Sequence, residues 1–350
     1  MTDQICVAID GMGGDNAPDM IIAGVNRAAQ THQDVKFLIF GDEARIGPLL
    51  DAFPTIQPRC EIRHTADAVS NDDKPTKALR TAKNSSMRLA IDAVANGEAS
   101  AIVSAGNTGA LMAMATIVLK MLPGISRPAI ATSFPTQTGD CVMLDLGANI
   151  ECDAGNLVQF AVMGEVYARN ELKLEQPSIG ILNVGVEGLK GNDSVKEAAG
   201  ILQNSSLPIK FYGFVEGDDI GKGTVDVIVT DGFTGNIALK TAEGTAKMFA
   251  HFLRNALTSS LMTKIGALIA KPAIEQLRSH FDPRRYNGAM LLGLNGICVK
   301  SHGGTDDIGF AHAVGVGVNL VKRDFNKHIK EDLGHLMTSE METSSQSAAE

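Results

Sequence analysis

The sequence contains no tryptophan, and aromatic residues make up only 5% of its 350 residues. It also lacks any run of about 18 apolar residues, the length that a membrane-spanning helix requires. Residues 1–4 lead directly into the apolar run 5–9, without the basic region or long apolar stretch of a signal peptide. We therefore expect a cytoplasmic protein that has neither a signal peptide nor a membrane span.

Basic residues are also in short supply. The formal net charge is −9 and the sequence pI is near 5.4. Because nucleic-acid backbones are bound mainly through lysine and arginine, this balance argues against a nucleic-acid partner. The five cysteines are odd in number and form no C-x-x-C pair. This favours free thiols in a reducing compartment.

Several catalytic signatures are missing as well. There is no G-x-S-x-G nucleophile elbow, no G-x-x-x-x-G-K-[ST] phosphate loop and no H-E-x-x-H metal motif. The loop 10–18 fails the G-x-G-x-x-G dinucleotide pattern, because Asn16 stands where the third glycine belongs. We expect neither a metal nor a cofactor.

Short β-branched runs alternate with longer helical patterns along the chain. The predicted strands are 6–9, 35–40, 101–104, 129–133, 142–146, 179–183, 210–213 and 225–229, and the predicted helices are 20–30, 87–96, 111–121, 158–170, 195–202 and 236–256. Most of the strands are continuously apolar, as expected for strands covered on both faces. The alternation predicts an α/β fold with a doubly wound, largely parallel sheet.

No internal repeat and no Pro/Ser-rich linker divides the chain. We therefore predict a single α/β domain over residues 1–337. The following segment, 338–350, is rich in Ser, Glu, Ala and Thr, a composition typical of a disordered tail.

Five loops are rich in glycine and small polar residues: 10–18, 104–109, 145–149 and 231–236 come at the ends of predicted strands, and 302–307 follows the apolar run 297–299. Ligands of doubly wound folds usually bind at the carboxyl ends of strands, and free N–H groups at a helix start favour anions. Each loop alone is more often a cap or a tight turn. Together, at the ends of strands of one sheet, they favour a polar ligand pocket.

Two side chains, Lys190 and His302, are candidate donors to a ligand in this pocket. Lys190 stands between glycines ahead of a helix that begins near Asp193, where its ammonium can reach a phosphate or a carbonyl oxygen. The alternative is a solvated loop lysine. His302 follows the apolar run 297–299 and can donate a proton or a hydrogen bond, although an isolated histidine is more often structural.

The segment 258–280 has a different character. Within residues 261–274 the apolar positions Leu261, Met262, Ile265, Leu268, Ile269 and Pro272 fall on one side of a helical wheel. From Arg254 to Arg285 there are six basic and two acidic residues. A basic amphipathic helix indicates contact with a membrane surface or an acidic partner. A core or dimer-interface helix fits the same pattern equally well.

With these loops in chain order, the sequence resembles the bacterial phosphate acyltransferases, or acyl-ACP:phosphate transacylases, of phospholipid synthesis. The matching segments cover nearly the whole chain outside the tail: 10–18, 104–109, 145–149, 188–193, 231–236 and 302–309. The resemblance implies a homodimer whose fold is similar to that of isocitrate dehydrogenase and phosphate acetyltransferase.

The resemblance also implies a function. A fatty acyl group would pass reversibly from acyl carrier protein to inorganic phosphate. The acyl phosphate would then feed a membrane glycerol-3-phosphate acyltransferase on the way to phosphatidic acid. Such an enzyme associates peripherally with the inner face of the membrane, through Leu261, Ile265, Leu268 and Ile269 in this chain.

By the same resemblance, Lys190 and Asn236 are the expected catalytic residues, because they can direct hydrogen-bond donors at a developing oxyanion. Phosphate is itself a nucleophile at neutral pH, so no serine or cysteine intermediate is required. The expected substrate-binding residues lie in the loops: Asp10, Gly13, Gly14, Asn16, Ser104, Gly106, Asn107, Thr108, Gly109, Asn149, Asp231, Thr234, Gly235 and His302.

Alternative functions stay open from the sequence. Acyl-CoA in place of the acyl carrier protein thioester is the nearest competitor. A dehydrogenase on a similar fold is disfavoured by the failed dinucleotide motif. A non-catalytic scaffold for a carrier protein or a membrane would explain the basic segment but not the ligand loops.

Overall fold

The computed structural model describes residues 4–205, 207, 209–280 and 282–331. In this part of the chain, eleven strands form one sheet in the order β3 (Cys60–His64), β2 (Lys36–Gly41), β1 (Cys6–Asp10), β4 (Ala101–Ser104), β11 (Ile297–Lys300), β10 (Ala289–Leu292), β5 (Ala129–Pro135), β6 (Asp140–Leu144), β9 (Val227–Val229), β7 (Ser178–Leu182) and β8 (Lys210–Val215).

Seven of the ten neighbouring strand pairs are parallel. The three antiparallel pairs, β11–β10, β10–β5 and β5–β6, lie together in the middle of the sheet. They separate a parallel half that contains β1, β4 and β11 from one that contains β6, β9 and β7. The predicted α/β class with a largely parallel sheet is confirmed.

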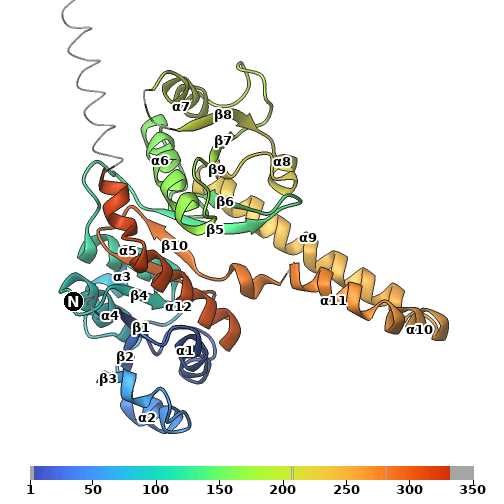
Figure 1. Cartoon of the computed structure of the whole chain (residues 1–350). Helices are drawn as coiled ribbons and strands as arrows, with labels where there is room; N and C mark the ends of the chain where they lie inside the picture. The colour runs from blue at the N-terminus through green and yellow to red at the C-terminus, as the bar shows by residue number, and fades with distance from the viewer. Residues whose placement is uncertain (1–3, 206, 208, 281, 332–350) are drawn as a thin grey trace, which may run out of the picture.

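Helices cover both faces of the sheet, as Figure 1 shows. One face carries α1 (Asp19–Thr31), α2 (Glu43–Asp51), α6 (Ala154–Glu171), α7 (Asp193–Asn204) and α12 (Asp307–Lys322). The other carries α3 (Pro75–Thr81), α4 (Ser86–Ala95), α5 (Thr108–Leu119), α8 (Gly217–Lys222) and the start of α9 (Gly232–Thr258).

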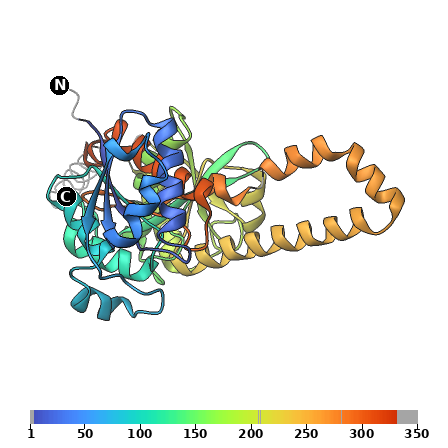
Figure 2. The same ribbon diagram turned by 90° about the horizontal axis from the view of Figure 1, so that it is seen from below.

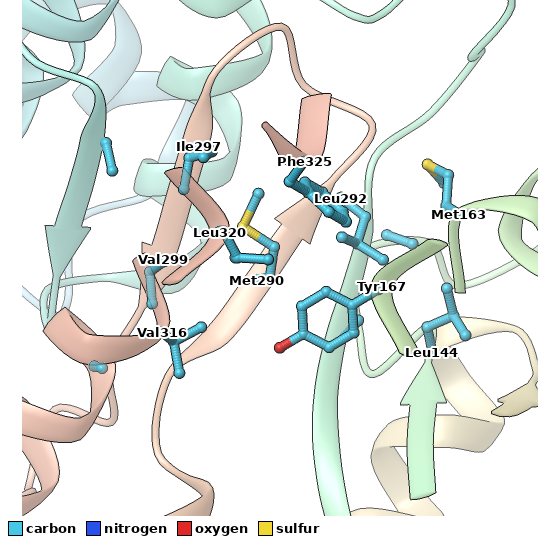
Figure 3. Packing of buried hydrophobic residues seen from close by; sticks show 14 of the residues in the cluster. Leu144, Met163, Tyr167, Met290, Leu292, Ile297, Val299, Val316, Leu320 and Phe325 are labelled. Atoms are coloured by element: carbon cyan, nitrogen blue, oxygen red, sulfur yellow. The ribbon is translucent and has the colours of Figure 1, made fainter. Parts of the chain in front are cut away.

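Two buried hydrophobic clusters correspond to these faces. In β1, Val7 and Ile9 belong to one cluster and Ala8 to the other, because successive strand residues point to opposite faces. The larger cluster joins the two halves of the sheet: Tyr167 of α6 packs edge-on against Phe325, with ring centroids 6.0 Å apart. Figure 3 shows both rings beside Leu292 and Met290 of β10. The two halves therefore share one core.

A helical hairpin projects from this body, as Figures 1 and 2 show. Its outgoing arm is the distal part of α9, and its return arm consists of α10 (Leu261–Ile269) and α11 (Lys271–His280). The sequence pattern predicted one amphipathic helix over 261–274, and this is wrong. The helix ends at Ile269 and a new one begins at Lys271, which places Pro272 in the first turn of α11, where its missing N–H costs no intrahelical hydrogen bond.

The apolar side of α10 is exposed in the chain. Leu261, Leu268 and Ile269 keep 78%, 72% and 78% of their surface, and Ile265 keeps 50%. No residue of α10 is buried. The alternative that this stripe faces the protein's own core is therefore wrong, whereas the membrane and dimer-interface alternatives both remain.

Most of the predicted elements are present with shifted ends. The sequence pattern missed β3, β10, α2, α3, α8 and α12, and it noted β11 only as the apolar run 297–299. In α12, Gly309, Gly315 and Gly317 interrupt the helical pattern. The predicted domain end at residue 337 and the tail 338–350 lie outside the described residues.

Candidate active site

The first loop cluster (residues 10–18, 104–109 and 300–307) follows β1, β4 and β11, which are neighbours in the sheet. Its centre is the buried carboxylate of Asp10. One carboxylate oxygen accepts a hydrogen bond of 2.6 Å from the Ser86 hydroxyl, and the other accepts one of 2.6 Å from the Ser104 hydroxyl. Burial raises the pKa of Asp10, and the two hydroxyl hydrogen bonds oppose that shift.

Lys300 lies beneath the same loops, and sequence reasoning missed it. Its ammonium donates to the carbonyl oxygen of Ala105 at 3.3 Å and to that of Ser301. Burial lowers the pKa of Lys300 to about 8, although Asp10 and Asp15 favour its charged form. The only sequence signal is a lysine at the end of the apolar run 297–299, a position that usually belongs to a solvated strand end.

The loops of this cluster pack backbone against backbone. A Cβ atom on Gly13 would lie 2.3 Å from a carboxylate oxygen of Asp10 and 2.7 Å from the backbone nitrogen of Gly106. The backbone N–H of Asp15 donates to the carbonyl of Gly303 at 2.9 Å. Glycine is therefore required at position 13 for the loops after β1, β4 and β11 to meet.

Asn107 is fully engaged in holding structure. Its side-chain oxygen caps α5 by accepting the N–H of Ala110 at 3.0 Å. Its side-chain nitrogen donates to the carbonyls of Asn71 at 2.9 Å and Asp73 at 3.0 Å. Thr108 and Gly109 occupy the first turn of α5, whose N–H groups have no intrahelical acceptor. An anion at this position would therefore be bound by backbone groups.

The backbone and the side chain of His302 each form a hydrogen bond with a nearby loop residue. Its backbone N–H donates to the side-chain oxygen of Asn287 at 2.8 Å, and its Nδ1 accepts the N–H of Gly304 at 3.1 Å. Burial lowers the pKa of His302, and Lys240 and Lys300 lower it further. A neutral ring whose Nδ1 accepts carries its hydrogen on Nε2, so the side chain offers one donor.

The second loop cluster (residues 145–150, 183–192 and 230–236) follows β6, β7 and β9. The buried carboxylate of Asp145 organises it. One oxygen accepts the backbone N–H groups of Ile130, Gly147 and Ala148 at 2.9–3.2 Å. The other accepts the backbone and side-chain nitrogens of Asn149 at 2.7 and 2.9 Å.

This scaffold positions the start of α9. The backbone N–H of Gly232 donates to the carbonyl of Asn149 at 2.7 Å. Asp231 caps the helix by accepting the N–H and the hydroxyl of Thr234, each at 2.8 Å. Asn236 lies in the second turn of α9, and its side-chain nitrogen donates to the carbonyl of Leu146 at 3.0 Å. The Asn236 side chain is otherwise exposed.

Lys190 lies in the loop that connects β7 to α7. Asn183 closes this loop by donating from its side-chain nitrogen to the carbonyls of Gly185 and Lys190, each at 3.1 Å. Gly191 has a φ of +94°, and a Cβ atom there would meet the Asn183 side-chain oxygen. The Lys190 side chain is exposed. Among the described residues, no acidic side chain forms an ion pair with Lys190.

The first turns of α9 connect the two clusters. Asn236 contacts the loop after β6, whereas Lys240, one turn further on, is near enough to His302 to lower its pKa. The predicted catalytic and substrate-binding residues therefore fall into the two loop clusters, with Lys190, Asn149 and the start of α9 in the second and the remaining residues in the first. Asn16 contributes its backbone carbonyl to the start of α1, and its side chain is exposed.

The cysteines do not have the environment of activated nucleophiles. Burial raises the pKa of Cys60 to about 11, and of Cys141 and Cys152 to about 12. It also raises the pKa of Cys6 and Cys298. A thiolate is the reactive form, so each thiol is unreactive near neutral pH. Within the described residues, no three His, Cys, Asp or Glu side chains are grouped as metal ligands would be.

Comparison with known proteins decides the family. The profile of a family described as "Fatty acid synthesis protein" matches residues 5–328. The phosphate acyltransferase of Rhodospirillum centenum is 60% identical over 339 residues, which cover 97% of this chain and 96% of that protein. The phosphate acyltransferase of Rhodospirillum rubrum is 57% identical over 333 residues, 95% of each chain. The chain belongs to the phosphate acyltransferase family.

Solved structures place this phosphate acyltransferase family member in a known fold. A phosphotransacetylase from Streptococcus pyogenes superposes with a TM-score of 0.62 at 15% identity, over 92% of this chain and 95% of that one. The EutD phosphotransacetylase from Staphylococcus aureus gives 0.59 at 16% identity, over 91% and 94%. The predicted likeness to the phosphate acetyltransferase fold is confirmed.

Family membership makes the protein an enzyme of the acyltransferase class. The relatives give no support to the dehydrogenase or the non-catalytic scaffold. In the described part of the chain, no helix is both long enough and apolar enough to cross a membrane.

Proposed function

We propose that this enzyme transfers a long-chain acyl group from acyl carrier protein to inorganic phosphate. The observation that carries the proposal is the exposure of Lys190, on the loop after β7, and of Asn236, in the second turn of α9 after the adjacent strand β9. A cationic donor and an amide donor held on glycine-rich turns suit a reaction in which negative charge develops on a carbonyl oxygen.

In the proposed reaction, a phosphate oxygen attacks the thioester carbon, and the carbonyl oxygen becomes an oxyanion near Lys190 and Asn236. The carbon–sulfur bond then breaks, and the thiolate leaves and takes up a proton from solvent. The product is an acyl phosphate. The backbone N–H groups at the start of α5 and the His302 ring are the proposed phosphate ligands, because they offer donors that are already oriented.

The transfer is direct, with no acyl-enzyme. The raised pKa values of all five cysteines support this part of the proposal. Mass spectrometry after mixing the enzyme with an acyl donor, without phosphate, should detect only unmodified protein. A covalent acyl adduct that phosphate discharges would contradict direct transfer.

One assay tests the function itself. Purified enzyme is mixed with phosphate and either acyl carrier protein thioester or acyl-CoA, and acyl phosphate is measured directly. We expect acyl phosphate from the carrier-protein donor at a higher kcat/KM than from acyl-CoA. Product from acyl-CoA alone would reassign the donor, and the absence of acyl phosphate with both donors would refute the function.

The proposed enzyme is a homodimer that works at the inner face of the membrane and delivers acyl phosphate to a membrane glycerol-3-phosphate acyltransferase. The exposed apolar side of α10 supports docking, because such side chains can enter the boundary between headgroups and acyl chains. Lys264 and Lys271 flank it and can reach anionic lipid, each contributing roughly 1 kcal/mol.

The docking proposal is tested by replacing Leu268 and Ile269 with Glu. Co-sedimentation with anionic liposomes should be abolished, while dimerisation and turnover in solution persist. Ile117→Glu, on an exposed position of α5, is the matched control and should still bind liposomes. A variant that becomes monomeric would instead identify the stripe as a dimer interface.

A further inference from the structure

Exposed apolar side chains lie on the same loop cluster as the two proposed catalytic donors, and we call them the apolar patch. It consists of six side chains that keep between 50% and 93% of their surface: Ile150, Val184, Val186, Leu189, Phe233 and Ile237. They belong to all three segments of the second loop cluster and to the start of α9. Apolar side chains scattered singly over a surface need no explanation, but a group at one site does.

Strand register brings these segments to one place. Leu144 of β6 pairs with Val229 of β9, and Val229 pairs with Ile181 of β7. The three parallel strands therefore end at the same level, and the loops that follow leave the sheet side by side. The hydrogen bond from Gly232 to the carbonyl of Asn149 ties two of them together.

The hydrogen bonds inside the loop after β7 leave its apolar side chains on the outside. Asn183 holds the carbonyls of Gly185 and Lys190 at the centre of the loop, and Gly185 itself is buried. Val184, Val186 and Leu189 are consequently on the outside, and Leu189 is 93% exposed. Leu189 directly precedes Lys190, just as Asn236 directly precedes Ile237.

We infer that this patch (Ile150, Val184, Val186, Leu189, Phe233 and Ile237) binds the hydrocarbon chain of the acyl donor. The inference rests on the proposed function. A long-chain thioester places a polar reacting carbon next to an apolar chain, and the patch places polar donors next to apolar side chains. A membrane or a second copy of the chain seated permanently on the patch would also cover its chain neighbours Lys190 and Asn236 and keep phosphate from them.

The test compares acyl donors of increasing chain length. Leu189→Ser and Ile150→Ser remove apolar contact on two different loops, and Ile117→Ser on α5 is the matched control. Affinity is measured by calorimetry with unreactive thioether analogues of the donor, and kcat/KM is measured with the thioesters. Burying one methylene group is worth about fourfold in affinity, from about 0.8 kcal/mol.

For the wild type and Ile117→Ser we expect affinity to rise with chain length. In Leu189→Ser and Ile150→Ser the affinity for the longest analogue should fall about tenfold, while that for the shortest analogue and the KM for phosphate stay unchanged. Equal losses at all chain lengths, or none, would overturn the inference.

Two other occupants have distinct signatures in the same variants. Loss of the dimer in sedimentation would assign the patch to a second copy of the chain, and loss of liposome binding would assign it to lipid. Either outcome overturns the acyl-chain inference. Failure of the wild type to form acyl phosphate would refute the proposed function instead, and the two failures are therefore distinguishable.

Discussion

The two loop clusters are both held in place by hydrogen bonds, but different chemical groups form these bonds in each cluster. In the first, side chains hold the loops: serine hydroxyls bind Asp10, Lys300 binds two carbonyls, and Asn107 pins the segment 70–73. In the second, the backbone does most of this, because four of the five donors to Asp145 are peptide N–H groups.

This difference decides which groups remain for a substrate. In the first cluster several polar side chains point inward, so that backbone N–H groups and the His302 ring remain available. In the second cluster the Lys190 and Asn236 side chains stay exposed. The first cluster is thus suited to bind a compact anion, and the second to direct side-chain donors at a reacting carbonyl.

The largest effect is expected from removing those exposed donors. Lys190→Ala and Asn236→Ala should each lower turnover on the order of 10²–10³-fold, the usual effect of losing one oriented oxyanion donor. Steady-state kinetics checks this, and the unfolding midpoint should remain that of the wild type. Lys196→Ala, on the neighbouring helix α7, is the control. Near-wild-type turnover in either folded variant would remove that residue from the catalytic list.

The buried aspartates should differ in how much stability they provide. Asp145→Asn should lower the free energy of unfolding by about 3 kcal/mol, because an amide nitrogen would face peptide N–H donors that cannot turn. Asp10→Asn should lower it less, by about 1 kcal/mol, because two of its donors are serine hydroxyls that can rotate and accept instead, and only the Met12 N–H is fixed. Urea denaturation measures both. Equal losses of unfolding free energy in the two variants would show that it makes no difference whether peptide N–H groups or hydroxyls donate to the buried aspartate.

The smallest effect concerns pH and Lys300. With a pKa of about 8 for this ammonium, kcat/KM for phosphate should decline severalfold above that pH, as the charge that orients two loop carbonyls is lost. Lys300→Arg stays protonated and should lack the decline. If Lys300→Arg has the same pH profile as the wild type, Lys300 is not the origin of the decline in kcat/KM.

Deprotonation of Lys300 should also affect stability. The free energy of unfolding should rise over the pH range in which kcat/KM for phosphate declines. The pKa of Lys300 is below its ordinary value of 10.5, so the unfolded chain binds more protons between about pH 8 and that value. The contribution of Lys300 to stability therefore rises with pH in this window. The rise should be absent in Lys300→Met when unfolding is followed across the same pH range.

Much of the fold followed from local pattern. Continuous apolar runs predicted β1, β4, β6 and β9, because strands covered on both faces need apolar residues at every position. The antiparallel strand β10 was missed. It has four residues and glycines at both ends, a pattern that turns share. Pro272 was the sequence signal for the break of the amphipathic segment, because proline is favoured in the first turn of a helix.

For the site, the sequence by itself determined which loops carry glycine and polar residues and which family they resemble, because glycine-rich turns at strand ends leave a local signature. Only the tertiary structure decided which of these side chains are bonded within the protein and which are exposed. Asn107 and Lys190 are both polar residues in glycine-containing loops, yet one is bonded within the protein and the other is exposed. Lys300 became a partly buried cation only when β11 was placed beside β4, since burial is a property of contacts between distant segments.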